Sequence, residues 1–452
     1  MSFTDYRTKT RKIDSEIGQR ANFLLHLPSI SIQLTHMTSI ARFAILLLSL
    51  PFIHPAAAQT QTWLPTWTAS PAPADPDPNE PILNLQNQTV RSRVRISAGG
   101  SQIRVRLSNE YGTSPIHVGS VTVAQPKDAA SIQPASLHQV TFAGKNSITI
   151  PAGAPVLSDP VSLDAPYGTE ISISLYFPNR VTAPTWHAFS RKTAVISGPG
   201  DHTHDEKIES GTETLSTLLV NAVLVPAQPS QHVIVAFGDS LVEGDGSTPD
   251  ADRNWPNDLI RRVEKSSAAS KLAIVNAGIV GNRLLEPGAV PSFGAAGLAR
   301  FDRDALSVPD VTHIVLLEGM NDIAFPGAKL GDLSLADPAN VRSADDVIGA
   351  YRQLIARAHA RGVKLIASTL TPCEGVIIPG YYSEAKEITR QAVNRWIRTS
   401  HEFDGVLDFD AVVRDPDHLS RISPKFASED HLHPNDAGYQ AMTDAIDLSL
   451  IE

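Results

Sequence analysis

Hydrophobic and polar residues follow two different patterns along this chain, and the pattern changes near residue 226. Between residues 90 and 225 apolar residues alternate with polar ones, as in Val90–Ile96 and Ile103–Leu107. A period of two is typical of strands with one buried and one solvated face, so we expect antiparallel sheets with one wet face, most simply a β-sandwich. Similar short runs recur at Ile148–Ile150, Ile171–Phe177 and Leu218–Val225.

After a short linker at 227–230, near-continuous apolar runs alternate with amphipathic stretches. The runs predict strands that are buried on both faces, at His232–Phe237, Leu272–Val275, His313–Leu317 and Val363–Ala367. The stretches between them predict helices, such as Trp255–Glu264 and Ala344–Ala360. This alternation predicts an α/β fold with three layers (α/β/α) around a parallel sheet. Active-site residues of such sheets gather at the carboxyl ends of the strands.

The first 58 residues belong to neither pattern. Residues 37–58 combine Arg42, the apolar run Phe43–Ile53 and the small residues Ala56–Ala58. The run is short for a membrane span, so we interpret this segment as a signal peptide that is cleaved after Ala58, with an uncleaved membrane anchor as the alternative. Residues 1–36 show none of these signal-peptide features, and we assign them to neither domain.

The expected organisation is therefore a leader at 1–58, a β-sandwich-like domain at 59–226, the linker at 227–230 and an α/β domain at 231–452. The leader contains six Lys or Arg and three Asp or Glu, so removing it changes the formal net charge from −10 to −13. An acidic protein is a poor partner for nucleic acid or an anionic membrane, whereas neutral glycans or small esters fit better. Cys373 is the only cysteine, so the chain can form no internal disulfide, and we interpret it as a small buried hydrophobe.

The first predicted strand of the α/β domain ends in Phe237-Gly238-Asp239-Ser240-Leu241. Ser240 is thereby placed on a turn at the edge of the sheet, where a nucleophile belongs. A Gly-Asp-Ser triplet alone is weak evidence, because Asp and Ser are common in turns and helix caps. The G-x-S-x-G elbow of the α/β-hydrolases is absent, which disfavours that family.

Three further segments contain polar or glycine residues that could serve the same site. The second strand leads into Asn276–Asn282, and the third leads into Glu318–Asp322. Near the C-terminus, Asp430 and His433 are three residues apart and can share one face of a helical turn. A carboxylate in that position can hold the Nδ1 proton of the imidazole and leave Nε2 free to act as a base.

These four ordered blocks, GDSL, a glycine after the second strand, G-x-N-D and D-x-x-H-P, resemble the SGNH/GDSL hydrolase family over residues 232–446. The N-terminal half, in particular the segment Trp63–Pro73, is similar to secreted, xylan-esterase-like members. The resemblance implies a serine esterase with Ser240 as nucleophile, His433 as general acid/base and Asp430 as its orienter. The leader predicts that this esterase is secreted or periplasmic.

The resemblance also implies an oxyanion hole formed by the backbone N–H groups of Ser240 and Gly281 and the side-chain amide of Asn321. Chemistry requires such donors, because attack of the serine on an ester places negative charge on the carbonyl oxygen. Gly278 competes with Gly281 for this role. No cofactor and no metal are expected, and Asp239 and Asp322 are interpreted as carboxylates that bind turn backbone.

Two metal-binding alternatives remain open at this stage. One uses the pair His431 and His433, and the other uses the segment His202–Asp205.

The substrate that the resemblance favours is an acetylated polysaccharide. The first alternative is a broad esterase or lysophospholipase, whose acyl chain would contact the apolar loops Ala324–Pro326 and Val376–Tyr382. The second is a carbohydrate-binding protein with an inert hydrolase domain, in which Trp186, His187 and Phe189 grip the sugar. The sequence leaves the acyl group, the glycan and the oligomeric state open.

If the leader is a signal peptide, the exported chain begins at or near Gln59, because Ala56 and Ala58 occupy the small-residue positions that signal peptidase recognises. The intact mass of the protein recovered outside the cytoplasm measures this directly. An exported chain that still contains Phe43–Ile53 would favour the membrane anchor instead.

Overall fold

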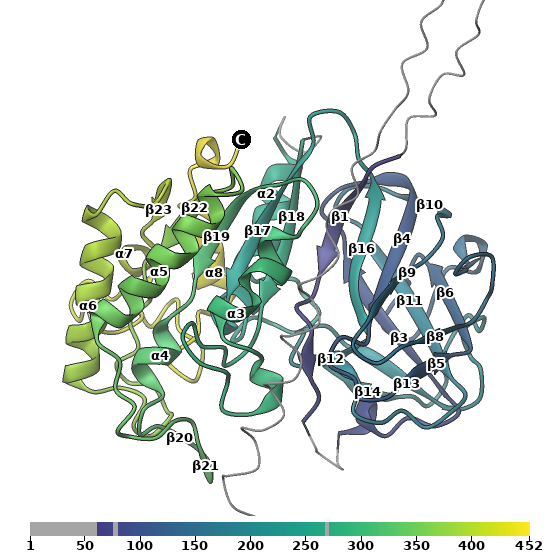
Figure 1. The fold of residues 1–452 in the computed structure, drawn as a ribbon, viewed down its shortest axis with the longest axis horizontal. Coiled ribbons are helices and arrows are strands. Elements are labelled where there is room, and N and C mark those ends of the chain that lie inside the picture. The colour runs from purple at the N-terminus through teal and green to yellow at the C-terminus, as the bar shows by residue number, and fades with distance from the viewer. Residues whose placement is uncertain (1–60, 76–79, 267–270) are drawn as a thin grey trace, which may run out of the picture. The chain divides into compact units, whose positions relative to one another are not determined.

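Two antiparallel sheets make up most of the N-terminal part of the chain (Figure 1). The structure is a computed structural model that describes residues 61–75, 80–266 and 271–452. The first sheet has the strand order β1 (Trp63–Thr68), β16 (Val220–Pro226), β4 (Gly100–Ser108) and β10 (Val161–Ala165), with β9 (Pro155–Leu157) also pairing with β4. Both sheets contribute to one cluster of buried side chains, so the expected sandwich-like arrangement is confirmed.

The second sheet has six strands. Their order is β14 (Thr212–Thr214), β13 (Ala194–Pro199), β3 (Gln88–Arg95), β11 (Glu170–Phe177), β6 (Ser120–Ala124) and β7 (His138–Gln139). Shorter strands form two small sheets: β15 (Thr217–Leu218), β12 (Thr185–His187) and β2 (Ala72–Pro73) in one, and β5 (Ile116–Val118) with β8 (Ile148–Ile150) in the other.

The expectation of one wet face is wrong at the centre of the second sheet. Arg91 of β3 should point to solvent by its alternating pattern, yet it is fully buried. Its guanidinium donates to Ser174 Oγ at 2.9 Å and to the carbonyl oxygens of Ala130 at 2.6 Å and Asp205 at 2.8 Å. Two long loops therefore cover this face, and the backbone carbonyls that they supply satisfy the buried cation.

A five-stranded parallel sheet organises the C-terminal part. Its order is β18 (Leu272–Gly278), β17 (His232–Gly238), β19 (Val311–Leu317), β22 (Lys364–Ser368) and β23 (Gly405–Leu407). In chain order this is 2-1-3-4-5, the arrangement of flavodoxin-like folds, so the predicted α/β fold class is confirmed. All the pairings within it are parallel, as the buried, β-branched strand sequences predict.

Helices cover both faces of this sheet. The side chains of Val233 and Val235 on β17 lie in one hydrophobic cluster with α3 (Gly297–Phe301), α5 (Ala344–His359) and α6 (Glu384–Thr399). Ile234 and Ala236, which point to the opposite face, lie in a second cluster with α2 (Trp255–Glu264), α7 (Phe409–Val413) and α8 (Asp436–Asp444). Figure 1 shows these helices on opposite sides of the strands. Alternate side chains of β17 thus pack into two separate hydrophobic cores, one on each face of the sheet.

Element boundaries follow local signals where these are strong. Helix α2 spans the predicted residues, and the Asn254 side chain accepts from the Asn257 N–H at its start. Helix α5 begins with a capping box formed by Ser343 and Asp346 and ends at His359, one residue before the predicted end. Strand β23 and helices α6 and α8 lie where no element had been assigned from the pattern.

The N-terminal part covers the open edge of the parallel sheet at β18. The Thr68 hydroxyl donates to the Asn276 carbonyl at 2.7 Å, and the Ile274 N–H donates to Ser97 Oγ at 2.9 Å. These contacts occupy backbone groups that an edge strand would otherwise expose. Residues Thr60–Glu452 form one compact unit, so the division into two domains at 227–230 stays a prediction.

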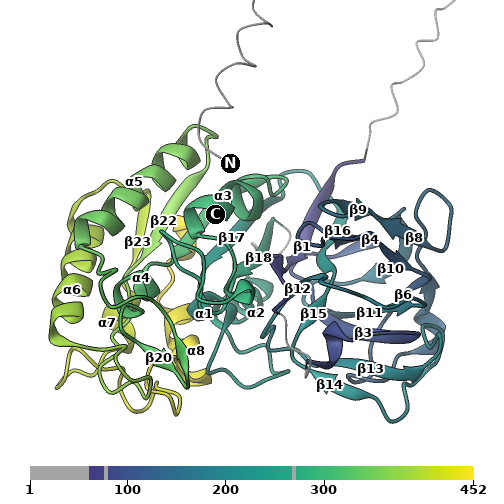
Figure 2. The ribbon, with the colours of Figure 1, turned by 60° about the horizontal axis from the view of Figure 1, so that its bottom comes forward.

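A buried ion pair links the β part to the helix that begins at Ser240. Figure 2 labels strand β12 and the short helix α1 (Ser240–Glu243) that this pair connects. His187 of β12 lies with Nε2 3.0 Å from the Glu243 carboxylate of α1, and its Nδ1 lies 2.9 Å from the Ser70 carbonyl. Burial lowers the pKa of His187, but the Glu243 carboxylate and the Ser70 carbonyl together raise it by more, so the net shift is upward.

Of the described helices, none is both long enough and apolar enough to span a membrane. The expected leader, residues 1–58, lies outside the described residues.

Glu243→Gln should lower the free energy of unfolding by about 1–3 kcal/mol at pH 6, because it removes the charged partner of a buried imidazole. Because the folded-state pKa of His187 is raised, the pair stabilises the fold fully below about pH 6.5, the usual imidazole value. That contribution is lost as the pH rises through the raised pKa, so the variant and the wild type should differ less at pH 9. Urea unfolding at both pH values measures the difference.

Glu264→Gln is the matched control, because Glu264 is an exposed acid on α2 that lies 4.0 Å from Arg95. Glu264→Gln should change the free energy of unfolding only slightly at both pH values. A Glu243→Gln effect that is the same at pH 6 and pH 9 would contradict a pH-dependent pair.

Candidate active site

Ser240 lies where the first parallel strand ends and a short helix begins. The Asp239 side chain caps this helix by accepting from the Leu241 N–H at 2.9 Å. The helix ends after one turn at Gly244, whose positive φ of 111° suits a residue without a Cβ. The serine is only 7% exposed, so it is a nearly buried residue at the carboxyl edge of the sheet rather than an exposed turn residue.

His433 and Asp430 reach this serine from the far end of the chain. His433 Nε2 lies 2.8 Å from Ser240 Oγ, and His433 Nδ1 lies 2.6 Å from Asp430 Oδ2. The three residues that the sequence singled out are therefore brought into one line of hydrogen bonds. The expectation that Asp430 and His433 share a helical turn is wrong, because this segment is a loop that precedes α8.

The local sequence explains why the loop holds this geometry. Asp430 Oδ1 accepts from the backbone N–H groups of Leu432 at 2.8 Å and His433 at 2.9 Å, and from Ser428 Oγ at 2.7 Å. One carboxylate thus folds the turn with one oxygen and leaves the other for the imidazole. His431 between them is exposed and has a positive φ of 57°.

The electrostatics of this line suit a general base. Burial alone lowers the pKa of His433, but the carboxylates of Asp430, Asp245 and Asp239 raise it by more, so the net shift is upward. Hydrogen bonds from His433 and Leu432 outweigh burial at Asp430 and hold its pKa well below its usual range. Asp430 therefore stays ionised while the imidazole gains and loses its proton.

The geometry separates the two glycines that compete for the oxyanion hole. The Gly278 N–H donates to the Asn276 side chain at 2.7 Å, and a Cβ at Gly278 would lie 2.4 Å from the Glu243 backbone nitrogen. Gly278 is therefore required for close packing of β18 against α1. Gly281 has a positive φ of 69°, and a Cβ there would lie 2.3 Å from the Phe293 ring. Within the described residues its N–H has no hydrogen-bond partner, which favours Gly281 as the donor.

Asn321, the side-chain donor of the expected hole, is 4% exposed at the start of α4 (Met320–Ala324). Its Nδ2 donates to the Asn282 carbonyl at 2.8 Å, and its Oδ1 accepts from the Tyr381 hydroxyl at 2.8 Å. An amide nitrogen carries two hydrogens, so one N–H of Asn321 remains for a substrate. The sequence did not point to Tyr381, because nothing in its apolar loop distinguishes it from a core residue.

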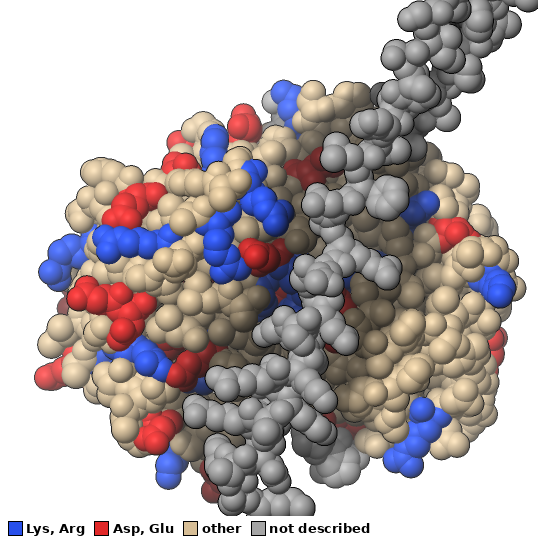
Figure 3. Space-filling model, in the orientation of Figure 1, with Lys and Arg blue, Asp and Glu red and all other residues tan. Residues whose placement is uncertain are grey.

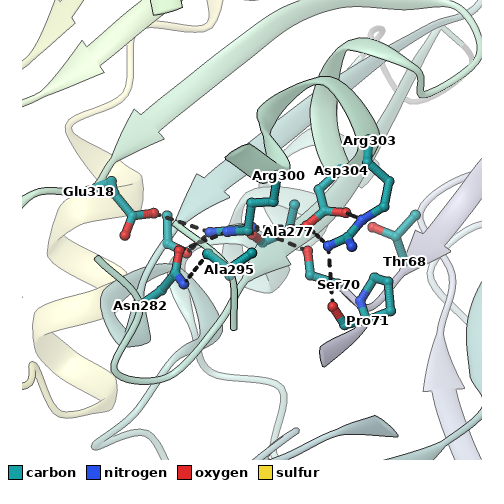
Figure 4. A network of polar contacts seen from close by, with 12 residues as sticks. Thr68, Ser70, Pro71, Ala277, Asn282, Ala295, Arg300, Arg303, Asp304 and Glu318 are labelled. Carbon is teal, nitrogen blue, oxygen red and sulfur yellow. Dashed lines mark hydrogen bonds and ion pairs between the residues drawn. The ribbon is translucent and has the colours of Figure 1, made fainter. Parts of the chain in front are cut away.

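A fully buried arginine ties together the loops that carry these donors (Figure 4). Arg300 of α3 donates to the carbonyl oxygens of Gly238 at 2.7 Å and Ala277 at 2.8 Å, which end strands β17 and β18. It also donates to Asn282 Oδ1 at 2.8 Å and to Glu318 Oε2 at 3.1 Å. Asn282 directly follows Gly281, and Glu318 directly follows the last residue of β19. The Arg300 side chain therefore contacts groups at the ends of three strands. The sequence held no signal for Arg300.

Asp239 and Asp322 accept from backbone N–H groups, as the sequence suggested, whereas the Glu318 carboxylate accepts from the Arg300 side chain. Asp322 accepts from the N–H groups of Leu284 at 2.6 Å and Leu285 at 2.8 Å, and burial raises its pKa to about 6. Burial raises the pKa of Asp239 to about 7 and that of Glu318 well above its usual range. These carboxyls hold loops in place and lie outside the serine–imidazole line.

The β part holds the loop that follows the serine helix. Arg191 lies 3.6 Å from the Asp245 carboxylate, and Lys192 lies 2.8 Å from Asp252. The Thr193 N–H and hydroxyl both donate to Asp250, at 2.9 and 2.6 Å. Three consecutive residues of one part thus position a loop of the other part, and Asp245 in that loop is one of the charges that act on His433.

Several other residues that the sequence nominated are not available for binding. Trp186 is 5% exposed and its indole donates to the Pro73 carbonyl at 3.0 Å, while His187 is engaged with Glu243. Of the three residues suggested to grip sugar, only Phe189 is exposed, at 48%. Cys373 is 2% exposed, and burial raises the pKa of its thiol to about 12.

The segment His202–Asp205 has a structural task. His202 Nδ1 lies 2.7 Å from Asp205 Oδ2, and the backbone carbonyls of both residues accept from Arg91. Polar atoms of this segment are therefore used within the β part.

Of the two apolar loops expected to contact an acyl chain, Val376–Tyr382 contacts Asp430, whereas Ala324–Pro326 is buried. The Ile377 N–H donates to the Asp430 carbonyl at 3.1 Å, and the Ile377 side chain is 66% exposed. Lys386 of α6 donates to the carbonyl oxygens of Ala324 and Pro326, both at 2.8 Å, and to that of Gly380 at 2.5 Å. One ammonium thus joins both loops.

Charge is mixed over the surface that Figure 3 shows. Lys and Arg side chains alternate there with Asp and Glu on the α/β part. This face thus mixes both signs of charge, and the formal net charge of the whole chain is −10.

Residues 236–441 match the model of the GDSL-like Lipase/Acylhydrolase family. The fold and this match define the chain as a carboxylic ester hydrolase. This match identifies residues 236–441 as a GDSL-like lipase/acylhydrolase domain. A comparison with curated protein sequences found no match.

Solved structures similar to this chain include an acetyl xylan esterase from Geobacillus stearothermophilus, with 18% identity, coverage of 49% of this chain and 95% of the other, and a TM-score of 0.37. A lipolytic protein of the G-D-S-L family from Desulfitobacterium hafniense has 18% identity, 48% and 97% coverage and a TM-score of 0.34. A GDSL-like lipase from Bacteroides thetaiotaomicron has 16% identity, 50% and 90% coverage and a TM-score of 0.35. These identities and TM-scores are too low to indicate what this chain acts on.

The rate constant kcat/KM for ester hydrolysis should rise with pH as His433 loses its proton, with a midpoint above about 6.5, because the folded-state pKa of His433 is raised. Asp245→Asn removes one of the charges that raise this pKa and should move the midpoint to lower pH. Asp239 titrates in the same range, so the midpoint belongs to the coupled groups. Steady-state rates from pH 5 to pH 9 measure both curves, and an unchanged midpoint in Asp245→Asn would contradict this assignment.

Proposed function

We propose that this protein hydrolyses carboxylic esters through an acyl-serine intermediate, with Ser240 as nucleophile, His433 as general acid/base and Asp430 as its orienter. The observation that carries the proposal is the continuous line of hydrogen bonds from Ser240 Oγ through His433 to Asp430, at 2.8 and 2.6 Å. A serine hydroxyl is a poor nucleophile until a base removes its proton, and this line supplies the base in a fixed tautomer.

In the proposed reaction, Ser240 Oγ attacks the ester carbonyl while His433 Nε2 takes the hydroxyl proton. The tetrahedral intermediate collapses when His433 returns that proton to the leaving alcohol, which leaves an ester on Ser240. Water then attacks this ester, with His433 again taking and returning a proton, and the carboxylic acid leaves. The Ser240 and Gly281 N–H groups and the Asn321 amide donate to the carbonyl oxygen while it carries negative charge.

For the natural substrate we propose acetyl groups on a neutral polysaccharide outside the cytoplasm. The acidic net charge supports a neutral alcohol over an anionic one. The resemblance of the four motif blocks and of the segment Trp63–Pro73 to secreted xylan-esterase-like chains supports the same choice. The sequence of the leader supports export.

A broad esterase or lysophospholipase is the second candidate, and one observation favours it. The exposed Ile377 side chain and its half-buried neighbours Val376 and Ile378 lie on the loop bonded to Asp430. An apolar rim beside the nucleophile would stabilise an acyl chain longer than acetyl, with about 0.8 kcal/mol for each buried methylene.

Ser240→Ala should lower ester turnover by several orders of magnitude and leave the melting temperature nearly unchanged, because it removes only one oxygen atom. Hydrolysis of p-nitrophenyl acetate and labelling by a fluorophosphonate measure this together. Ser247→Ala is the matched control, since that buried hydroxyl donates to the Gly244 carbonyl and lies outside the proposed machinery. Retention of more than a few percent of activity by Ser240→Ala would place the nucleophile elsewhere.

The same assay with acetate, butyrate and octanoate esters separates the two candidates, alongside acetate release from acetylated xylan. The acetyl-glycan proposal requires the acetate ester to be the best of the three and acetate to be released from the polymer. A rate that rises with acyl length would support the broad esterase.

A further inference from the structure

The orientation of the Asn321 amide is set by two neighbours of different chemistry. On one side lies the Asn282 carbonyl, which can only accept a hydrogen bond, 2.8 Å from Asn321 Nδ2. On the other side lies the Tyr381 hydroxyl, 2.8 Å from Asn321 Oδ1. Because the carbonyl requires a donor, the nitrogen must face Asn282, and the tyrosine must therefore donate to the oxygen.

We propose that Tyr381 is a positioning residue for the oxyanion hole, which holds the Asn321 amide so that its second N–H points at the substrate carbonyl oxygen. This inference rests on the proposed function, since it assigns Asn321 the role of oxyanion donor. Without the phenol hydroxyl, Asn321 Oδ1 would be buried with no donor, and the amide would be free to rotate about its last side-chain bond. A donor that must first be oriented contributes less to catalysis than one already in place.

Tyr381 is itself held firmly. It is 2% exposed, its ring packs edge-on against Phe325 at a centroid distance of 6.0 Å, and its N–H donates to the Ile378 carbonyl at 3.2 Å. Lys386 binds the carbonyl of Gly380, the residue before it, at 2.5 Å. Burial raises the pKa of Tyr381 well above its usual range, so the hydroxyl keeps the proton that it donates.

The residue that binds Asn321 also adjoins Gly281, whose N–H is the second proposed oxyanion donor. Asn282, which accepts from Asn321, directly follows Gly281 in the chain. Its own side chain is fixed by Arg300 and by the carbonyls of Phe293 and Ala295, at 2.6 and 2.8 Å from Asn282 Nδ2. Asn321 is therefore fixed between a rigid backbone on one side and the Tyr381 hydroxyl on the other.

The test is a double-mutant cycle of Tyr381→Phe and Asn321→Ala in the full chain, with p-nitrophenyl acetate as substrate. Asn321→Ala should lower kcat by roughly 10² to 10³, the usual loss on removing one oxyanion donor. Tyr381→Phe keeps the donor but loses its orientation, so kcat should fall roughly tenfold with KM changed less than twofold. In the Asn321→Ala background, Tyr381→Phe should cause no further loss, because there is no amide left to orient.

Rates are expressed for each site that a fluorophosphonate labels, as counted by mass spectrometry, and the melting temperature is recorded for every variant. Tyr176→Phe is the matched control, because its hydroxyl donates to Asn87 Oδ1 at 2.7 Å within the β part, and its kcat should stay within twofold of the wild type. A Tyr381→Phe variant with a lower melting temperature but a normal kcat per labelled site would overturn the proposal in favour of a structural tyrosine.

An equal loss from Tyr381→Phe in both backgrounds would also overturn the proposal, since the tyrosine would then act by another route. Failure of the proposed function would look different. In that case Ser240→Ala would remain active, or Asn321→Ala would keep a normal kcat, and the role of Tyr381 would fall with that of Asn321.

Discussion

The fully buried guanidinium of Arg300 is the interaction on which the rest of the site depends. Where parallel strands end, the last carbonyl groups and the loops beyond them need partners that the sheet no longer supplies. Arg300 satisfies the ends of β17 and β18 and contacts Asn282 and Glu318 with one planar group (Figure 4). A guanidinium is suited to this task because its donors point in fixed directions. Removing it would leave buried acceptors and the Glu318 carboxyl without a partner.

The same network continues into the β part of the chain. Arg300 approaches Ser70 Oγ at 3.4 Å, Arg303 donates to the Pro71 carbonyl at 3.2 Å, and Thr68 reaches the Asn276 carbonyl. His187 also contacts Ser70, through its carbonyl oxygen, and pairs with Glu243. Residues of both parts of the chain therefore hold the helix that starts at Ser240. The β part thus helps to position the proposed nucleophile.

Rigid support of this kind has a chemical consequence. An oxyanion donor accelerates a reaction only if it already points at the place where charge develops, because reorienting it during the reaction costs free energy. The chain of hydrogen bonds from Arg300 through Asn282 to Asn321 and Tyr381 joins buried groups on four separate segments of the chain. Such a chain in a dry environment is stronger than its separate bonds would be in water.

Periodicity and local motifs were sufficient to predict the α/β fold, the sandwich-like β part and four of the five strands of the parallel sheet. In the β part they located β3, β4, β8, β11 and β16 and missed the other described strands. The pattern also placed Ser240, Asn321 and Gly281 at one edge of the sheet, since parallel strands all end there. These predictions succeed because a strand buried on two faces and a capped helix leave a local signature in residue type.

The sequence could not show which distant residues would fill the space between those elements. Arg300 and Tyr381 have no periodic or motif signal, and Arg91 has a misleading one, because its alternation indicates a wet face that two loops cover in the fold. The choice between Gly278 and Gly281 also depends on contacts with Glu243 and Phe293. Sequence thus determined what each segment becomes, since that depends on neighbouring residues, whereas the tertiary structure decided which buried polar groups find partners, since those partners lie far apart along the chain.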